Sequence, residues 1–543
     1  MKRRLGVLVG VMLAAAGLVT GAVTAIGASS NTSFDRQALA QRLLRSPVSH
    51  YMTWPARAAL NATASGTRAL GPSISQASSG DRVPTGTSGL RASGAPLTNV
   101  RVNNPAEDTA QVDQTTQSEP MVTASGSNVA VGFNDSQNTL PFFTAATTLS
   151  GYAYSSDGGA TFTDGGALPN SPGFMNLGDP WLAHDRAGNM YYSNLAIDGT
   201  TGNLDIAIAK STDGGKTWTT KPLYAPGASV LYQADKDALT AGRDPTTPSQ
   251  DDLYAAWDDF SLHPQDTGFV ATLGLPVAHS TDGGATWTVS YAARSVESLT
   301  GCSFTQYIGA DPFVDPSNGT LYVASERLSA EDPNCTGVAP TRSEVIFRST
   351  DGGKTFTKGV QIATVTQAFA SGALALGPGQ LMRDLEFPSG AILAGKLYVA
   401  WNDGSGGHSH LVLASSGDGG ATWNVAPVLT DSADELQPAV SADTALHILY
   451  YKTNPGGTLD VYASDTSDGT TFTTQKVTTQ SSPGVFTAPQ FDPVIAGAYM
   501  GDYIGNASDG THQYFVWGDN RDTVTDSLWP HGRQDPNVYF ATR

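Results

Sequence analysis

Short stretches in which apolar and polar residues alternate recur along most of the chain. Examples are residues 204–210 (LDIAIAK), 344–348 (EVIFR) and 411–415 (LVLAS). A period of two places every second side chain on the same face of an extended backbone, so each stretch predicts a β-strand. A Gly-containing turn and a few polar or β-branched residues follow each one. The pattern therefore predicts an all-β protein built from hairpins.

The turn of these hairpins is itself repeated. It reads SSDGGATF from Ser155, STDGGKTW from Ser211, STDGGATW from Ser280, STDGGKTF from Ser349 and SGDGGATW from Ser416, with a shortened form, TSDGTTF, from Thr466. In such a turn the Asp side chain accepts backbone N–H groups, a Gly takes positive φ, and the final aromatic ring packs inward. We therefore expect a structural role, not a catalytic one, for Asp157, Asp213, Asp282, Asp351 and Asp418.

The consensus of this turn, S-x-D-x-G-x-T-W/F, resembles the Asp box of the sialidase-like, or BNR-repeat, β-propellers, and the resemblance covers about residues 98–543. In that family the boxes lie on the outside of the blades, away from the active site. The resemblance implies a β-propeller of four-stranded antiparallel blades. It also implies an activity related to those of exo-α-sialidases and other glycoside hydrolases.

A second repeat precedes the hairpins. Strands rich in aromatic residues, such as residues 253–259 (LYAAWDD) and 397–403 (LYVAWND), each follow a shorter strand that opens with an acidic residue. Seven such units predict seven blades, the last of them closed by residues 97–103 (LTNVRVN), and six blades are the alternative. The acidic residues then either ring a central funnel or only fix turns. They are Glu119, Asp179, Asp235, Asp311, Asp384, Glu435 and Asp502.

A sialidase site needs three arginines that bind the substrate carboxylate, a tyrosine nucleophile next to a glutamate, and an acid/base aspartate. The family's first arginine lies in an R-I-P motif, where this chain has Glu119-Pro120. Arg383, Arg521 and Arg327 remain as candidates, each alternatively a surface ion-pair partner. We expect the substrate-binding residues to be Arg383, Arg521 and the acidic ring.

Tyr503 is the candidate nucleophile, with Glu386 or Glu435 as its activator; alternatively it is a packed aromatic residue. If no tyrosine acts, a pair of carboxylates performs the hydrolysis, and their separation decides the stereochemical outcome. Such a pair would be drawn from Glu119, Asp179, Asp311, Glu435 and Asp502.

Composition and charge exclude one class of protein, and the first residues predict export. Only 15% of the residues are charged and the net charge is −19, so the basic surface of a nucleic-acid-binding protein is missing. Residues 1–28 combine Lys2, Arg3 and Arg4 with an apolar run, which predicts a signal peptide or a retained signal anchor. Residues 29–96, rich in Ser, Ala and Gly, predict a linker or propeptide, and residues 97–543 the propeller.

Disulfides form in the oxidising environment of exported proteins, so we expect Cys302 and Cys335 to form one. We expect no cofactor, although residues 315–319 (DPSNG) resemble a calcium-binding turn. The sequence thus predicts a secreted monomer, without a membrane span in its mature form, that acts on extracellular carbohydrate as a sialidase-like glycoside hydrolase. The alternative is a non-catalytic propeller that binds glycans or proteins at the cell exterior.

Overall fold

The computed structural model describes residues 97–107, 116–138, 148–227, 231–265, 268–297, 302–334, 336–369, 372–377, 380–486, 500–525, 530 and 532–543. The predicted signal segment 1–28 and linker 29–96 lie outside these residues. The described part contains β-strands and two short 3-10 helices, η2 (Pro105–Glu107) and η4 (Ser136–Asn138). No helix in it is long and apolar enough to cross a membrane. The prediction of an all-β protein is confirmed.

Most strands belong to antiparallel sheets whose four strands follow one another in sequence. The first sheet consists of β2 (Gln117–Ser125), β3 (Asn128–Asp135), β4 (Ser150–Ser155) and β5 (Thr163–Ala167). Two more have the same order, β15 (Phe304–Val314), β16 (Leu321–Ala330), β17 (Thr341–Ser349) and β18 (Val360–Val365), and β21 (Ser389–Leu393), β22 (Lys396–Asp403), β23 (His410–Ser416) and β24 (Asn424–Pro427). A further one contains β25 (Glu435–Ala442), β26 (Leu446–Thr453), β27 (Thr458–Thr466) and β28 (Thr473–Lys476), with β29 (Ser482–Pro483) also paired to β27.

A nine-stranded sheet between these consists of two such units joined at one point. One unit contains β7 (Trp181–His184), β8 (Met190–Asp198), β9 (Leu204–Ser211) and β10 (Thr219–Tyr224), with β6 (Phe174–Asn176) paired to β8. The other contains β11 (Leu231–Arg243), β12 (Asp251–Gln265), β13 (Gly268–Ser280) and β14 (Thr288–Glu297). A single parallel pair, Gln233 with Leu204, connects them.

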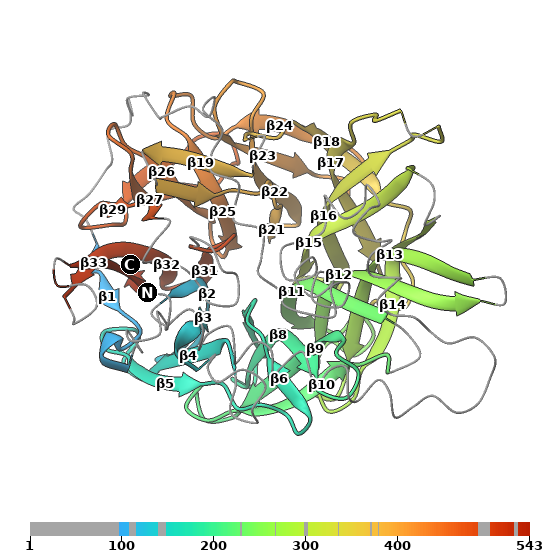
Figure 1. Ribbon diagram of the computed structural model, residues 1–543, viewed down its shortest axis with the longest axis horizontal. Helices are drawn as coiled ribbons and strands as arrows, with labels where there is room; N and C mark the ends of the chain where they lie inside the picture. Colours follow the sequence, from blue (N-terminus) through green and yellow to red (C-terminus); the bar gives the residue numbers. More distant parts are fainter. Residues whose placement is uncertain are drawn as a thin grey trace, which may run out of the picture.

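The last sheet pairs strands from opposite ends of the described chain. Its order is β1 (Val100–Arg101), β33 (Arg533–Thr542), β32 (Gln513–Val524) and β31 (Gly505–Ser508). Val100 lies opposite Phe540, and the backbone N–H of Val102 donates to the Val538 carbonyl at 2.8 Å. Figure 1 shows the blue strand β1 beside the red strand β33.

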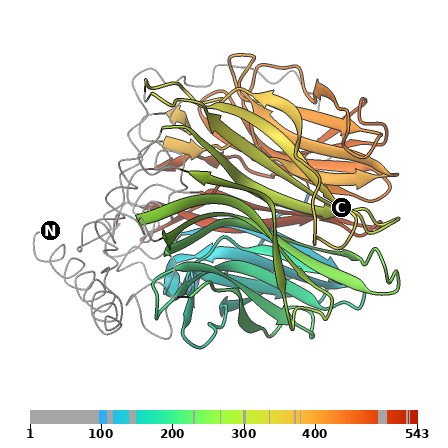
Figure 2. The same cartoon turned by 90° about the vertical axis from the view of Figure 1, so that its right-hand side faces the viewer.

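The sheets follow one another around a common centre (Figure 1), and Figure 2 shows them from the side. The strands β2, β7, β11, β15, β21, β25 and β31, one from each unit, all contribute residues to the lining of one central cavity. This arrangement is that of a β-propeller, as the Asp-box turns predict.

The repeated turns have the predicted local geometry. In one of them, Thr217 donates its backbone N–H at 3.0 Å and its hydroxyl at 2.7 Å to the Asp213 carboxylate. The same two contacts recur in the four other complete copies. Because all the partners lie within a few residues of each other, the turn forms independently of the rest of the fold.

Each turn also contacts the preceding sheet. The Tyr152 hydroxyl of β4 donates to the carbonyl of Lys216 at 3.2 Å, and the Lys210 ammonium of β9 donates to that of Gly283 at 3.0 Å. None of the described Asp-box residues lines the central cavity. The turns therefore fasten neighbouring sheets together on the side remote from the cavity.

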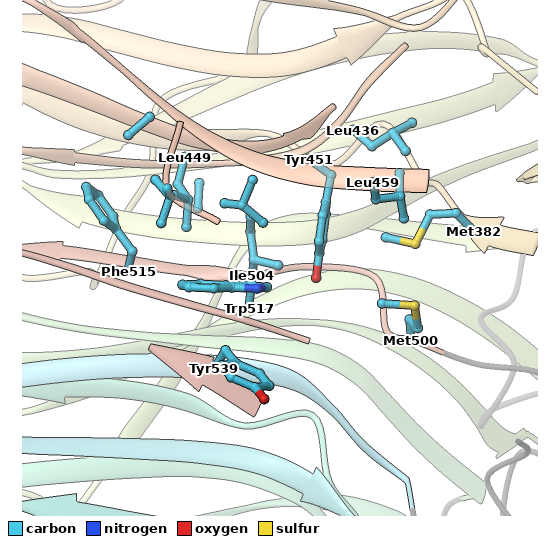
Figure 3. Packing of buried hydrophobic residues seen from close by; sticks show 14 of the residues in the cluster. Met382, Leu436, Leu449, Tyr451, Leu459, Met500, Ile504, Phe515, Trp517 and Tyr539 are labelled. Carbon is cyan, nitrogen blue, oxygen red and sulfur yellow. The ribbon is translucent and has the colours of Figure 1, made fainter. Parts of the chain in front are cut away.

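The hydrophobic core lies between neighbouring sheets. Figure 3 shows one cluster, in which Tyr451 and Trp517 lie among Leu and Met side chains, and the Tyr451 hydroxyl donates to the Gly518 carbonyl at 2.6 Å. Met382 joins this cluster from a separate three-stranded sheet of β19 (Ala373–Gly377), β20 (Gln380–Arg383) and β30 (Val485–Phe486). Packing of Met382 fixes the end of β20, and thereby the position of Arg383.

Candidate functional site

Several innermost strands carry a β-bulge at an equivalent point. The pairing register shifts around Glu119 in β2, Lys236 in β11 and Gln437 in β25. These residues have φ values of 51°, 47° and 52°, and Asp179, just before β7, has 56°. A left-handed conformation costs a non-glycine residue about 1–3 kcal/mol, and a bulge re-aims its side chain. Such strain requires strong contacts that hold these residues in place.

Lys236 provides these contacts. Its Nζ lies 2.8 Å from Asp502 Oδ2, 3.1 Å from Asp179 Oδ2 and 3.2 Å from Glu119 Oε1. All four side chains are buried. The Lys236 ammonium donates a hydrogen bond to Glu119 Oε1 and forms ion pairs with Asp179 and Asp502. The cluster therefore joins the inner ends of three sheets through one cation.

Glu119 is held on both of its oxygens. The backbone N–H of Asp502 donates to Oε1 and the Asn134 amide donates to Oε2, both at 2.9 Å. The other end of the Asn134 amide accepts the Asp179 backbone N–H at 2.8 Å. Gly501 has a φ of 92°, and a Cβ atom there would lie 2.4 Å from Glu119 Cγ. Only glycine permits this close approach.

Arg383 and Gln437 complete the cluster. Arg383 Nε lies 2.9 Å from Asp502 Oδ1. The Gln437 amide donates to the carbonyls of Arg383 and Gly501, both at 2.9 Å. Asp502 is thus placed between two cations, Lys236 and Arg383.

The cluster adjoins the central cavity, which has a volume of about 290 Å³. Lys236, Asp237, Asp502 and Tyr503 contribute to its lining. Trp181 lies beside Tyr503 with ring centroids 5.6 Å apart, and Lys236 Nζ lies 5.4 Å from the centre of the Tyr503 ring. Apolar side chains form much of the remaining wall: Leu182, Phe313, Leu385 and Phe387.

Asp237 differs from the other acidic residues of the site. Its side chain is buried, and neither carboxylate oxygen forms a hydrogen bond of normal geometry among the described residues, although the Ser193 hydroxyl lies near enough to lower its pKa. It lines the same cavity as Asp502. A buried carboxylate without a partner is costly unless it is protonated or bound by a ligand. Asp237 therefore marks a position where the cavity accepts hydrogen bonds.

The carboxyl groups of this site have opposite pKa shifts. Burial raises the pKa of Asp502, but Arg383 and Lys236 lower it by more, so it lies below the ordinary value. Burial raises the pKa of Asp237 well above its ordinary value, and also raises that of Asp179 against the effect of Lys236. The cavity thus combines a carboxylate that stays ionised with one that retains its proton.

The structure brings several of the predicted residues together: Glu119, Asp179, Arg383, Asp502 and Tyr503. Asp235 adjoins them, because its Oδ1 accepts the Lys236 backbone N–H at 2.9 Å, and burial raises its pKa to about 7. Asp311 lines the cavity but accepts the Gly390 N–H at 2.6 Å, and burial raises its pKa to about 7. The bulge of β15 instead contains Gly309, with a φ of 66°.

The predicted residues Asp384, Glu386 and Glu435 have partners outside this cluster. Asp384 Oδ2 accepts the Asn402 amide at 2.7 Å. Glu386 Oε1 accepts the Ala368 N–H at 2.8 Å, and its Oε2 lies 3.3 Å from Arg342 Nη1. Leu385 and Phe387 line the cavity, whereas Glu386 between them does not.

Glu435 lies 3.1 Å from Lys452 Nζ, and it accepts the Leu411 N–H at 3.1 Å. The cavity position in β25 belongs to Gln437, two residues later. The expectation that the acidic residue of each unit faces the funnel therefore does not hold for Glu435.

The Tyr503 hydroxyl donates to the Pro180 carbonyl at 3.0 Å, whereas Glu386 accepts a hydrogen bond from Ala368 and Glu435 one from Leu411. Burial raises the pKa of Tyr503 well above its ordinary value. Without a carboxylate that takes its proton, a tyrosine is a poor nucleophile. The geometry gives Tyr503 the position of an aromatic wall beside Trp181.

The candidate arginines are dispersed. Arg383 lies at the cluster, while Arg521 pairs with Asp519 at 2.5 Å and stacks on the Tyr539 ring. Arg327 donates to Gln361 Oε1 at 2.8 Å. These three arginines do not converge on one point, so they form no carboxylate-binding triad.

Sequence reasoning missed Lys236, Asp237, Gln437 and Trp181. A signal for part of this set exists, because Glu119, Asp179 and Gln437 each precede a proline, and they share the left-handed conformation. Lys236 takes the equivalent place between two aspartates, of which only Asp235 was predicted as a site residue. The bulge position, not the acidic character, is what the units share.

Within the described part of the chain, no group of three or more His, Cys, Asp and Glu side chains is placed to hold a metal ion. At the calcium-like turn, the Asp315 carboxylate accepts the Ser317 N–H at 2.8 Å and the Asn318 amide at 2.7 Å. Cys302 is disulfide-bonded, and Cys335 lies outside the described residues.

No protein-family model matches the chain. A xyloglucanase of Hypocrea jecorina (strain QM6a) is 29% identical to it over 339 residues, which are 59% of this chain and 34% of that protein. The chain thus matches about a third of the length of this curated relative.

Solved structures of similar fold include a Hadza microbial sialidase, with 13% identity, a TM-score of 0.38 and coverage of 73% of this chain and 74% of that one. The α-L-arabinofuranosidase of Fusarium graminearum, in complex with arabinobiose, has 14% identity and a TM-score of 0.39, covering 68% and 94% of the two chains. The Trypanosoma rangeli sialidase has 13% identity and a TM-score of 0.34, covering 71% and 55%. Sialidases are among the solved structures to which the chain is similar.

Proposed function

We propose that this protein is a glycoside hydrolase that acts on extracellular glycans, with its site where the Lys236 cluster meets the central cavity. The observation that carries the proposal is that Asp237 and Asp502 line one cavity while their pKa values are shifted in opposite directions. Acid-base hydrolysis of a glycoside needs one carboxyl group that holds a proton and one that stays ionised.

In this proposal Asp237 protonates the glycosidic oxygen as the bond from that oxygen to the anomeric carbon breaks. The ionised Asp502, fixed by Arg383 and Lys236, stabilises the positive charge that develops on the anomeric carbon. Water adds its hydroxyl group to that carbon and loses a proton to the ionised Asp237. Trp181 and Tyr503 provide an aromatic surface for one face of the sugar ring.

The proposal also includes a seven-bladed propeller closed by β1, because β1 pairs with β33 and the described sheets succeed one another around the cavity. The cavity volume of about 290 Å³ lies near the lower end of ligand pockets, which suits a single sugar unit. Secretion follows from the signal-like segment of residues 1–28 and belongs to the same proposal.

A hydrolysis screen tests this function. The purified protein is incubated with xyloglucan and with fluorogenic glycosides that include an α-L-arabinofuranoside and a sialoside. We expect turnover of at least one substrate, and a loss of about 100-fold or more in kcat for Asp237→Asn and Asp502→Asn. Asp418→Asn, in an Asp box away from the cavity, is the matched control and should keep the wild-type rate per folded molecule.

Two outcomes contradict the proposal. Wild-type rates in both Asp237→Asn and Asp502→Asn would place the chemistry elsewhere. Binding of glycans without any turnover would establish the alternative of a non-catalytic propeller.

A further inference from the structure

We infer that the site binds a neutral sugar unit and rejects acidic sugars, an inference that rests on the proposed glycoside hydrolase function. It goes against the sialoside preference that the Asp-box resemblance implies.

Lys236, the cation that lines the cavity, is surrounded by carboxylates. Its Nζ donates a hydrogen bond to Glu119 and forms ion pairs with Asp179 at 3.1 Å and Asp502 at 2.8 Å. Arg383, whose Nε lies 2.9 Å from Asp502 Oδ1, is not part of the cavity lining. An acidic sugar would have to compete with these buried carboxylates to reach Lys236.

The surrounding charge also opposes an anion. Asp235 and Asp237 lie in the same bulge as Lys236 and are buried with it. A second carboxylate brought close to the ionised Asp502 would be repelled, and it would lose its hydration on entering the cavity. A neutral ligand avoids both penalties.

The free hydrogen-bonding capacity of the wall fits the hydroxyl groups of a neutral sugar. Asp237 offers two buried oxygens without a partner among the described residues, and its protonated carboxyl group both donates and accepts hydrogen bonds. A sugar hydroxyl also donates and accepts, so it satisfies both oxygens, whereas an ionised sugar carboxylate only accepts. The C–H face of the ring can pack on Trp181 and Tyr503, whose ring centroids lie 5.6 Å apart.

Matched pairs of sugars test the inference. Methyl glucoside with methyl glucuronide, and methyl galactoside with methyl galacturonide, differ only at the carboxylate, and both anomers of each are used. Methyl xyloside and methyl sialoside complete the set. Binding is measured at pH 7 by saturation-transfer NMR and titration calorimetry, so the result does not depend on turnover. We expect the neutral member of a bound pair to bind at least about tenfold more tightly than the acidic one.

Glu119→Gln releases one Lys236 donor while it keeps the shape of the side chain. We expect this variant to lower the preference for the neutral sugar, measured as the ratio of the two dissociation constants in a pair, by about tenfold. Asp179→Asn should act in the same direction. Glu331→Gln, an exposed change of the same chemistry, is the control that should leave the ratio unchanged. Thermal unfolding of each variant verifies that it folds. If a variant does not fold, the ratio of dissociation constants measured for the wild-type protein tests the inference by itself.

The outcomes separate the two levels of the proposal. Equal or tighter binding of the acidic members overturns the inference while glycoside hydrolysis stands. Failure of the wild-type protein to bind or cleave any sugar of the set overturns both.

Discussion

Lys236 and Asp502 form an ion pair of 2.8 Å between Nζ and Oδ2, although β11 and the segment before β31 are far apart in the sequence. Both side chains are buried, and Asp502 holds a second cation, Arg383, at 2.9 Å. One lysine thus contacts three carboxylates that three different sheets bring to the centre. The predictions below begin with this pair.

Lys236→Met should lower the free energy of unfolding by about 3–5 kcal/mol, because it leaves buried carboxylates without their cation. Urea-induced unfolding at pH 7 measures the effect. The exposed Lys221→Met is the control and should change stability by less than about 0.5 kcal/mol. Similar stabilities of the two variants would show that the cluster does not hold the sheets.

Asp213→Ala should lower the free energy of unfolding by about 1–2 kcal/mol, because the turn loses the acceptor of the two Thr217 contacts. Turnover per folded molecule should stay at the wild-type value, since the described Asp-box residues do not line the cavity. Chemical denaturation measures the free energy of unfolding, and steady-state kinetics on the same preparation measure the turnover. A loss of turnover at unchanged stability would assign a functional role to the turn.

Two truncations test the pairing of β1. A chain that begins at residue 94 keeps β1, and we expect wild-type stability. A chain that begins at residue 105 loses the Val102 bond to Val538 and the Asn103 amide, which donates to Asn537 at 2.7 Å and accepts the Val538 N–H at 2.8 Å. We expect it to be less stable by about 3 kcal/mol or more. Equal thermal stability of the two chains would refute a closing role for β1.

Glu344→Gln should stabilise the protein at pH 8 and have little effect at pH 5. Burial raises the pKa of Glu344 well above its ordinary value, and both of its carboxylate oxygens lack partners among the described residues. Burial and the nearby Glu326 raise the pKa of Glu386 to about 8.

A raised pKa means that the folded state binds the proton more tightly. The stability that the Glu344 proton provides is fully present below the ordinary pKa of a glutamate, 4.5, and is lost as the pH rises from there toward the raised pKa of the folded state. Glutamine removes this loss, so we expect a gain of about 1–3 kcal/mol at pH 8, measured by urea unfolding at both pH values. Glu331→Gln, on the surface, is the control. An equal gain at both pH values would show that Glu344 does not titrate in this range.

Tyr503→Phe should lower turnover by less than about tenfold and leave ligand affinity almost unchanged, because a single hydrogen bond is lost. The lost bond is the donation to the Pro180 carbonyl at 3.0 Å, and the ring contact with Trp181 remains. Steady-state kinetics on the best substrate of the screen measure the effect. A loss of about 1,000-fold or more would restore Tyr503 as the nucleophile of a sialidase mechanism.

The sequence by itself determined the local parts of this fold. Alternating stretches such as residues 204–210 became β9, and every complete Asp-box turn has the predicted hydrogen bonds. These features depend on residues within a few positions of each other, so the chain encodes them without reference to its neighbours in space. The structural role of Asp213 and its equivalents could be predicted for the same reason, because their hydrogen bonds join residues within four positions of each other.

Only the tertiary structure decided which side chains meet at the centre. A bulge adds one residue to a strand and exchanges the faces of the residues beyond it, and no local pattern marked where the bulges fall. Glu386 therefore points to Arg342 while Leu385 and Phe387 line the cavity, and Gln437 takes the place expected for Glu435. Lys236 escaped notice for the same reason, because its three partners, Glu119, Asp179 and Asp502, come from sheets that meet only when the propeller is assembled.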